Sequence, residues 1–418
     1  METALHDDLD AYHYMDDKEA FSIVRQYMNL QQPVNSNPVS RYYRFHDSIE
    51  QFHPKNVIII LMESMATWKM KTFGNTENRT PFLDSLYHQG IAFANMYSAG
   101  IHTHVGVYAT HVSYPVIFDH HPMRGIFYKK YYALPQILLE KGYHTLFFVP
   151  HGKTFDNLGA FLDLNGFEKI YYDKDYPSDS LRSVWGVDDH FLLHYAIRQI
   201  DSLTARSNKP FMATVLTVSD HRPFYIPDFI PGENEEVRAT RFADYALKTF
   251  FESAKQKPWF KNTLFVFAAD HGETHHMIYP TPLTYNHMAA IFYGQGIKPQ
   301  IINRPVSQLD IFPTIMHLLH LDFLNMTFGL DALTEYRPYV FFNHDNLYGV
   351  LDNEFLLVAN RQKILGLYRY QNKDKTNYAG RFPEISRNMH RFLQAHIQTA
   401  AYILKNNLQE LKTATDNR

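Results

Sequence analysis

The chain has 418 residues, of which 45% are hydrophobic and 15% aromatic, so it can bury a sizeable core and is not disordered as a whole. Its formal net charge is −3 with both signs interspersed, which gives no general attraction to nucleic acid. Cysteine is absent, which excludes disulfides, thiolate catalysis and cysteine-bound zinc. The 24 histidines include several close pairs, a composition that favours metal or phosphate chemistry.

Residues 1–54 read as an N-terminal arm with a helix over 18–28, and no apolar run is long enough to span a membrane. We predict no signal peptide in its first residues. Predicted strands then alternate with predicted helices up to residue 320. The strands are predicted at 57–62, 91–97, 145–149, 210–219, 265–269 and 288–293. The helices are predicted between Thr80 and Gly90, and at 134–141, 155–165, 187–206, 243–257 and from the Ser307/Asp310 capping arrangement onward.

This alternation predicts an α/β fold with a mostly parallel central sheet flanked by helices. After residue 335 the pattern changes to short antiparallel strands at 339–342, 354–359 and 364–370, followed by a closing helix over 386–411. We therefore expect three parts, namely the arm at 1–54, a catalytic domain at 55–335, and a small C-terminal β-subdomain with its helix at 336–418.

Two predicted strands end in side chains that suit a divalent cation. Glu63 follows the apolar run 57–62, and Asp270 with His271 follows 265–269. Because side chains at the carboxyl ends of parallel strands meet in one crevice, these residues are candidate metal ligands. The alternatives are a helix cap or a satisfied acid for Glu63, and a structural ion pair for the other two.

A turn of small residues, 98–106, carries Thr103 at the expected start of a helix. A hydroxyl there could act as a nucleophile toward phosphorus, although from the residues alone an N-cap role for Thr103 is favoured. His221 and His151 also follow strand ends, and either could instead be a structural histidine. Five predicted strand ends carry such groups, which is more than chance would give. The combination therefore strengthens the functional interpretation of each residue.

These segments together resemble the sulfatase-like branch of the alkaline phosphatase superfamily, in particular phosphoglycerol transferases of the lipoteichoic acid synthase type. The matching segments, in the family's order, are residues 56–64, 80–86, 93–97, 102–103, 165–167, 185–189, 217–224, 270–273 and 307–314.

The resemblance implies one divalent metal ion, most often manganese and otherwise magnesium or zinc. Its expected ligands are Glu63, Thr103, Asp270 and His271. Thr103 would be the nucleophile and form a phosphothreonine-type intermediate. The expected donor is a phospholipid head group or another phospho-alcohol. The expected acceptor is an envelope glycan or polymer, and His221 would be the second catalytic residue.

The residues that the resemblance assigns to the substrate are His151, Lys153, Trp185, His221 and Arg222. The family's head-group pocket carries a Trp and an Arg shortly after the His-Gly, whereas this chain has Asp156 and Leu158 there. The head group can therefore differ from glycerol phosphate, with Lys153 or Arg222 as the replacement cation or simply as a surface charge.

Competing functions remain open on the sequence. A phosphodiesterase, phosphatase or sulfatase-like hydrolase would use water as acceptor, but the turn at Thr103 lacks the formylglycine motif of true sulfatases. Phosphoethanolamine transfer is disfavoured by the absence of cysteine, and a non-catalytic binding module is less favoured than an enzyme. We expect an extracytoplasmic catalytic portion at the bacterial cell membrane, held there by a segment absent from this chain.

Overall fold

The computed structural model describes residues 9–45, 53–117 and 120–411. Its central sheet is built from β2 (Asn56–Met62), β3 (Ile91–Phe93), β5 (His144–Phe148), β6 (Lys169–Tyr171), β9 (Phe211–Leu216), β10 (Thr263–Ala269), β12 (Ala290–Tyr293) and β13 (Gln300–Ile302). The strand order is β13-β3-β12-β10-β2-β9-β5-β6, and β12 alone among these eight runs antiparallel to its neighbours. Every residue of β2, β9 and β10 is buried, as expected for strands that are covered on both faces.

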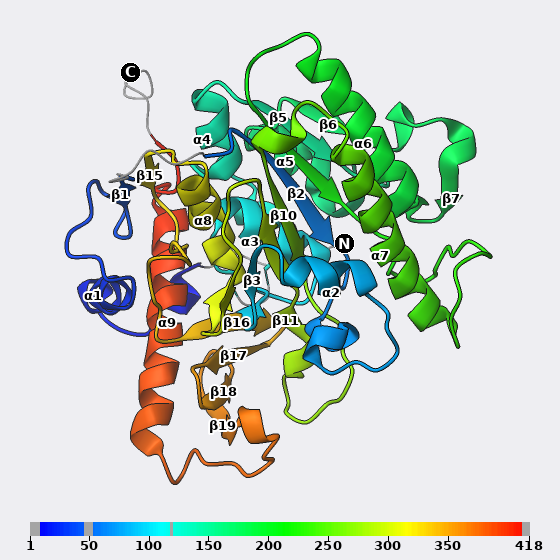
Figure 1. Ribbon diagram of the computed structural model, residues 1–418. Helices are drawn as coiled ribbons and strands as arrows, with labels where there is room; N and C mark the ends of the chain where they lie inside the picture. The colour runs from blue at the N-terminus through cyan, green and yellow to red at the C-terminus, as the bar shows by residue number, and fades with distance from the viewer. Residues whose placement is uncertain (1–8, 46–52, 118–119, 412–418) are drawn as a thin grey trace, which may run out of the picture.

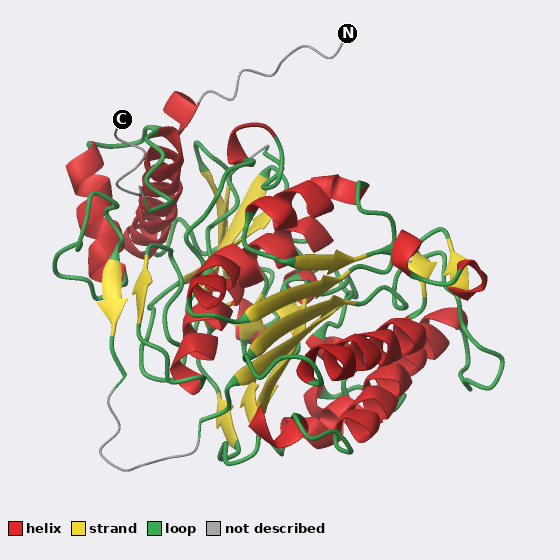
Figure 2. Ribbon diagram, turned by 90° about the horizontal axis from the view of Figure 1, so that it is seen from above, coloured by secondary structure: helices red, strands yellow, loops and turns green. Residues whose placement is uncertain are grey.

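Helices cover both faces of this sheet (Figure 2). On one face α6 (Asp189–Thr204) packs against α7 (Glu235–Ala254), which also contacts α2 (Pro81–Tyr87). The other face carries α3 (Thr103–Val112), α4 (Leu134–Glu140), α5 (Leu158–Leu164) and α8 (Ile311–Leu318). The predicted α/β class with a mostly parallel central sheet is confirmed.

A second, antiparallel sheet lies beside the first, as predicted for the C-terminal part (Figure 1). It consists of β16 (Val340–His344), β17 (Leu347–Leu351), β18 (Phe355–Ala359) and β19 (Ile364–Arg369). The closing helix α9 (Pro383–Lys405) covers one face, where the rings of Phe341 and Phe392 lie 5.7 Å apart. The opposite face packs on the catalytic part, with Phe342 6.2 Å from Tyr97.

The predicted N-terminal arm contacts both other parts of the chain. Helix α1 (Asp17–Tyr27) packs against α9, and β1 (Arg41–Tyr43) pairs with β15 (Phe323–Asn325). The remaining short strands are β4 (Met96–Tyr97), β7 (Leu181–Ser183), β8 (Gly186–Val187), β11 (His287–Met288) and β14 (Val306–Ser307). The division at residues 54 and 335 stays a prediction. Among the described residues, no helix combines the length and the apolar character that crossing a bilayer requires.

Several elements differ from the prediction, and three of the differences have identifiable reasons. Helix α7 begins eight residues before the predicted 243, because Asn234 caps it by accepting a hydrogen bond from Val237 N. Strand β17 was not predicted, since Gly349 interrupts its apolar run; a Cβ there would lie 2.2 Å from the Phe342 ring. The segment predicted as one strand at 91–97 divides into β3 and β4, which belong to different sheets.

The capping box at the start of the 308–318 helical segment is confirmed: Ser307 N donates to Asp310 Oδ2 at 3.0 Å.

Asp310 is buried and also pairs with Arg337, whose Nε lies 3.2 Å from Oδ2. Replacing Arg337 by leucine leaves this carboxylate buried without its counter-charge. We expect the free energy of unfolding to fall by about 3–5 kcal/mol, measured by urea denaturation.

The matched control is Arg391→Leu, which removes an exposed arginine paired with Glu19. Because exposed ion pairs contribute little, this change should cost less than about 1 kcal/mol. Equal losses for the two variants would show that the burial of the Arg337 pair is without consequence.

Candidate active site

A cavity of about 510 Å³ opens where β2 and β10 end. Its walls include Glu63, Thr103, His104, Asp156, His221 and His271. It therefore collects groups from distant parts of the chain at the carboxyl ends of parallel strands, the position where α/β proteins bind ligands.

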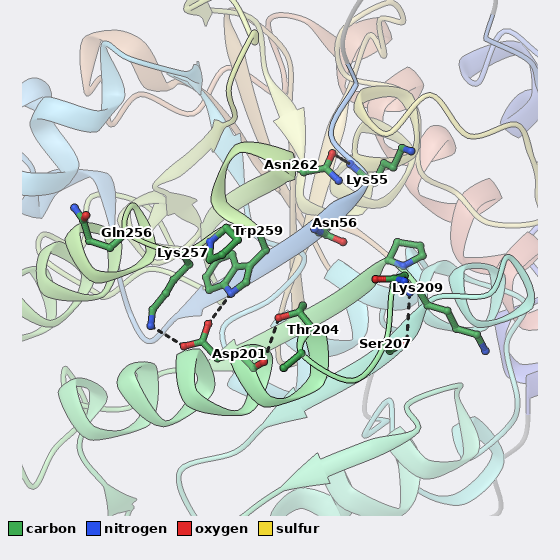
Figure 3. A pocket seen from close by; sticks show the side chains of 14 residues that line it. Lys55, Asn56, Asp201, Thr204, Ser207, Lys209, Gln256, Lys257, Trp259 and Asn262 are labelled. Carbon is green, nitrogen blue, oxygen red and sulfur yellow. Dashed lines mark hydrogen bonds and ion pairs between the residues drawn. The ribbon is translucent and has the colours of Figure 1, made fainter.

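A larger hollow of about 640 Å³ lies at the opposite ends of the strands, where β2 begins at Asn56 (Figure 3). Its polar side chains satisfy one another, since Asp201 accepts hydrogen bonds from Lys257 and from Trp259 Nε1 at 2.6 and 2.9 Å. None of the predicted site residues lines it. We therefore take the smaller cavity as the candidate site, because the volume of a cavity does not show that its side chains can catalyse a reaction.

Glu63 and Asp270 lie side by side because β2 and β10 are parallel neighbours in register. Ser64 links the two, as its N–H donates to Asp270 Oδ1 at 2.9 Å and its hydroxyl to Glu63 Oε1 at 2.7 Å. Asp270 is fully buried, yet its Oδ2 has no hydrogen-bond partner among the described residues. An orphaned buried carboxylate oxygen is costly unless a cation binds it.

His271 is the third member of this group. Its Nδ1 donates to the carbonyl oxygen of Gly272 at 2.7 Å, which leaves the Nε2 lone pair free. Nε2 lies 3.5 Å from Asp270 Oδ2 and 3.9 Å from Glu63 Oε1. One ligand atom from each residue therefore lies within 4.8 Å of the others, and these residues form a candidate divalent-metal site.

Thr103 is the first residue of α3 and lies next to this group. His102 occupies the N-cap position, so Thr103 does not have the N-cap role that the residues alone favour. Its hydroxyl instead donates to Glu63 Oε2 at 3.2 Å. Gly106 permits this approach, because a Cβ there would lie 2.6 Å from the carbonyl oxygen of Asp270.

Burial and charge perturb the titration of these groups. Burial, and then the neighbouring charge of Asp270, raise the pKa of Glu63 to about 7. Burial opposes a charge on His271, but the Asp270 and Glu63 carboxylates outweigh it and raise the pKa of His271. Such perturbation is typical of functional sites, and here it reflects two carboxylates and an imidazole buried side by side.

Sequence comparison agrees with this geometry. The sulfatase family model, described as "Sulfatase", matches residues 55–321, which is more than half of the chain. The chain belongs to the sulfatase family. The resemblance seen in the sequence is confirmed, and the protein is an enzyme of the alkaline phosphatase superfamily.

Two relatives of this sulfatase-family chain are named for an activity. It is 24% identical over 316 residues to the lipoteichoic acid synthase-like protein YvgJ of Bacillus subtilis, covering 67% of this chain and 50% of that protein. It is 26% identical over 271 residues to phosphoglycerol transferase I of Salmonella agona, covering 59% of this chain and 35% of that protein. The chain thus spans half or less of these relatives' length.

Solved structures agree with the fold. An alkaline phosphatase superfamily protein of Vibrio parahaemolyticus superposes with a TM-score of 0.86 at 25% identity, covering 97% of this chain and 100% of that one. The lipoteichoic acid synthase LtaP of Listeria monocytogenes superposes with a TM-score of 0.72 at 19% identity, covering 93% and 98%.

Of the predicted substrate residues, His221 and Arg222 line the cavity. The Nδ1 of His221 donates to the carbonyl oxygen of Arg222 at 2.6 Å, and the ring of Trp185 packs on His221 at 4.3 Å. Trp185 is thus placed behind His221, while the guanidinium of Arg222 turns outward to pair with Glu236.

The other two substrate candidates do not line the cavity. His151 lies behind Phe155, with ring centroids 4.7 Å apart, and burial lowers its pKa. Lys153 lies against α5 and pairs with Asp163 at 2.5 Å. The structure therefore gives no support to Lys153 as the replacement cation, and it seats Phe155 at the cavity in its place.

Two further features were missed in the sequence. Lys69 is buried and bridges Asp220 and Glu273, at 2.8 and 2.7 Å, so it ties together the loops that follow β9 and β10. The C-terminal sheet also reaches the site, since Asp345 accepts a hydrogen bond from His102 at 2.8 Å. Both contacts join segments more than 150 residues apart, and no local sequence pattern reports them.

Proposed function

We propose that this chain transfers a phosphoglycerol-type group from a lipid head group to an envelope glycan or polymer. The similarity to a lipoteichoic acid synthase-like protein and to phosphoglycerol transferase I supports this reaction class. The observation that carries the proposal is the hydroxyl of Thr103, held 3.2 Å from Glu63 at the start of a helix and facing a cavity. We place the reaction at the extracytoplasmic face of the bacterial membrane.

The residues present fit a metal ion. Glu63, Thr103, Asp270 and His271 would hold it, and the unpartnered Oδ2 of Asp270 and free Nε2 of His271 are the ligand atoms that such an ion needs. Two carboxylates, a hydroxyl and one imidazole suit manganese best, with magnesium or zinc as alternatives. When bound, such an ion lowers the pKa of a hydroxyl and neutralises charge on the phosphoryl group.

The side chains then divide the reaction between them. The Thr103 hydroxyl gives its proton to the Glu63 carboxylate that accepts its hydrogen bond, and its Oγ1 attacks phosphorus. The bond to the lipid alcohol breaks, and His221, which lines the same cavity, gives its Nε2 proton to the departing oxygen. In the second half the acceptor oxygen attacks phosphorus and its proton moves to His221, while the bond to Thr103 breaks and the Thr103 oxygen takes its proton back from Glu63.

The experiment that tests this function supplies the chain with Mn²⁺ and a phosphatidylglycerol-type lipid, with and without a glycan acceptor. A transferase should release diacylglycerol and label the acceptor with phosphoglycerol, whereas a hydrolase should release free glycerol phosphate at the same rate without the acceptor. Phosphatidylethanolamine in parallel reports head-group choice. If no lipid of either class is turned over, the proposed donor class is wrong.

Gly106→Ala tests whether the close approach of α3 matters. The added methyl group would meet the backbone of Asp270 at 2.6 Å and push Thr103 away from Glu63. A displacement of about 1 Å can cost about 10²-fold in rate, so we expect a loss of that order in kcat. Gly380→Ala is the control, since a Cβ there has nothing within 4 Å. Equal activity of the two variants would argue against the tight packing.

A further inference from the structure

We infer that the wall of the same cavity holds a second cation site, formed by His104, His121 and Asp156, which selects a zinc-type dication. The proposed reaction does not use these residues. The two sites share no ligand. Thr103 belongs to the first site, and its neighbour in the chain, His104, belongs to the second.

The geometry of the three side chains fits a tetrahedral ion. His104 Nδ1 lies 3.1 Å from Asp156 Oδ2, and His121 Nε2 lies 3.5 Å from Asp156 Oδ1. One ligand atom from each residue lies within 4.8 Å of the others. Bonds of about 2.0–2.2 Å in tetrahedral geometry place ligand atoms about 3.3–3.6 Å apart, so only small movements are needed.

Burial also favours a ligand here. The Nε2 of His121 is buried and has no hydrogen-bond partner of good geometry among the residues that the structure describes. The rings of His104 and His121 stack with centroids 3.9 Å apart, which orients both toward the same carboxylate. A buried, unpartnered imidazole nitrogen is a group that a metal ion would satisfy.

The backbone is shaped to present Asp156. Its φ is +51° and that of Asn157 is +59°, both in the left-handed region, which is uncommon for residues other than glycine. The Asn157 side chain donates to the carbonyl oxygen of Met123 at 2.7 Å, and this bond joins the loop of Asp156 to the loop of His121. Such conformations persist where the surroundings impose them, and they concentrate at functional sites.

Three present contacts would yield on binding, and the first is the hydrogen bond that His104 Nδ1 donates to Asp156 Oδ2 at 3.1 Å. Arg124 donates to Asp156 Oδ1 at 3.2 Å, but its side chain is 55% exposed and can turn to solvent. Met123 N–H donates to His121 Nδ1 at 3.2 Å, and this bond would be lost when the imidazole proton leaves Nε2 for Nδ1. All three are weak hydrogen bonds beside zinc–imidazole coordination, so an ion bound here could displace them.

The ligand set predicts the metal and its use. Two imidazoles and one carboxylate suit zinc, whereas the first site has one imidazole and harder oxygen ligands. His104 and Asp156 line the cavity, so the fourth position faces the space that the substrate would occupy. Three protein ligands and an open position are the arrangement of zinc sites that bind water or a substrate oxygen.

The test is metal stoichiometry, which does not depend on the proposed reaction. The full chain, stripped with EDTA, is dialysed against micromolar ZnCl₂ and its zinc is counted by mass spectrometry. We expect two ions per chain for the wild type, and one each for His121→Ala, His121→Asn and Asp156→Asn. Asp270→Asn should lose the other ion and keep this one. His88→Ala, an exposed histidine, should keep two.

A zinc-edge anomalous map of the soaked wild type should show a peak between the three side chains. Near-unchanged circular dichroism and Tm of the variants establishes that they fold, and the two His121 variants guard against a packing defect of either one. A zinc content that is the same in the wild type and in both His121 variants would overturn the inference and leave these residues as an ion-pair network.

Discussion

Thr103→Ala is expected to abolish turnover, lowering kcat by about 10⁴-fold or more while leaving the fold unchanged. The hydroxyl is the atom that would form the bond to phosphorus, and the Ser64 hydroxyl nearby is already bonded to the other carboxylate oxygen of Glu63, Oε1. The side chain is only partly buried at the start of α3, so its truncation should change Tm little. The measurement is phospholipid turnover with saturating Mn²⁺, with thermal unfolding as the control for structure.

The matched variant is Thr103→Ser, which keeps the hydroxyl and its hydrogen bond to Glu63. It should retain measurable turnover and, with a slow lipid substrate, show by intact mass a covalent phospho-alcohol adduct that Thr103→Ala lacks. Full activity of the alanine variant, or an adduct that maps elsewhere in the chain, would refute the assignment of the nucleophile.

The site was predictable from sequence where the local pattern and the topology agree. Glu63 and Asp270 each follow a fully apolar run, and parallel pairing of such strands brings their ends together without knowledge of the loops. The start of α3 was likewise readable, because a small-residue turn before a helix predicts a hydroxyl at the helix N-terminus. Gly106, which lets that helix approach Asp270, carries no such signal.

What could not be predicted depends on contacts between loops. Asp156 was noted only as a departure from the family, because nothing in the sequence shows that its backbone turns left-handed and faces His104. Asp345 reaches His102 through the turn between β16 and β17, and β17 itself was missed. The role of Lys153 stays a prediction: its position shortly after His151 suggested it, whereas its side chain pairs with Asp163 on α5.

Removal of the metal is expected to abolish turnover, and the affinity for the metal should depend on pH. Glu63 must be ionised to bind a cation, and its pKa in the folded metal-free protein is raised to about 7. Below pH 7 a proton therefore competes with the metal, and the apparent affinity should fall by up to about tenfold per pH unit. We expect EDTA to abolish turnover, and the Mn²⁺ concentration that restores it to be higher at pH 6 than at pH 8.

The same shift predicts how stability responds. A carboxyl whose pKa is higher in the folded than in the unfolded state favours folding below the unfolded value, and loses that contribution as pH rises toward 7. Without a bound metal, the protein should thus have a lower free energy of unfolding at pH 8, where the carboxylates of Glu63 and Asp270 repel each other. Mn²⁺ at a hundred times its Kd should then add about 2.7 kcal/mol to the free energy of unfolding.

The quantity to measure is the difference in Tm with and without Mn²⁺, at fixed concentration, from pH 5.5 to 8. The pH slope alone is not diagnostic, because burial also raises the pKa of Asp189 and Asp244 to about 7. Those carboxylates accept backbone hydrogen bonds away from the cavity and should cancel in the difference. Glu63→Gln should remove the metal-induced shift at every pH; a shift that persists in this variant would mean that Mn²⁺ stabilises the protein at another place.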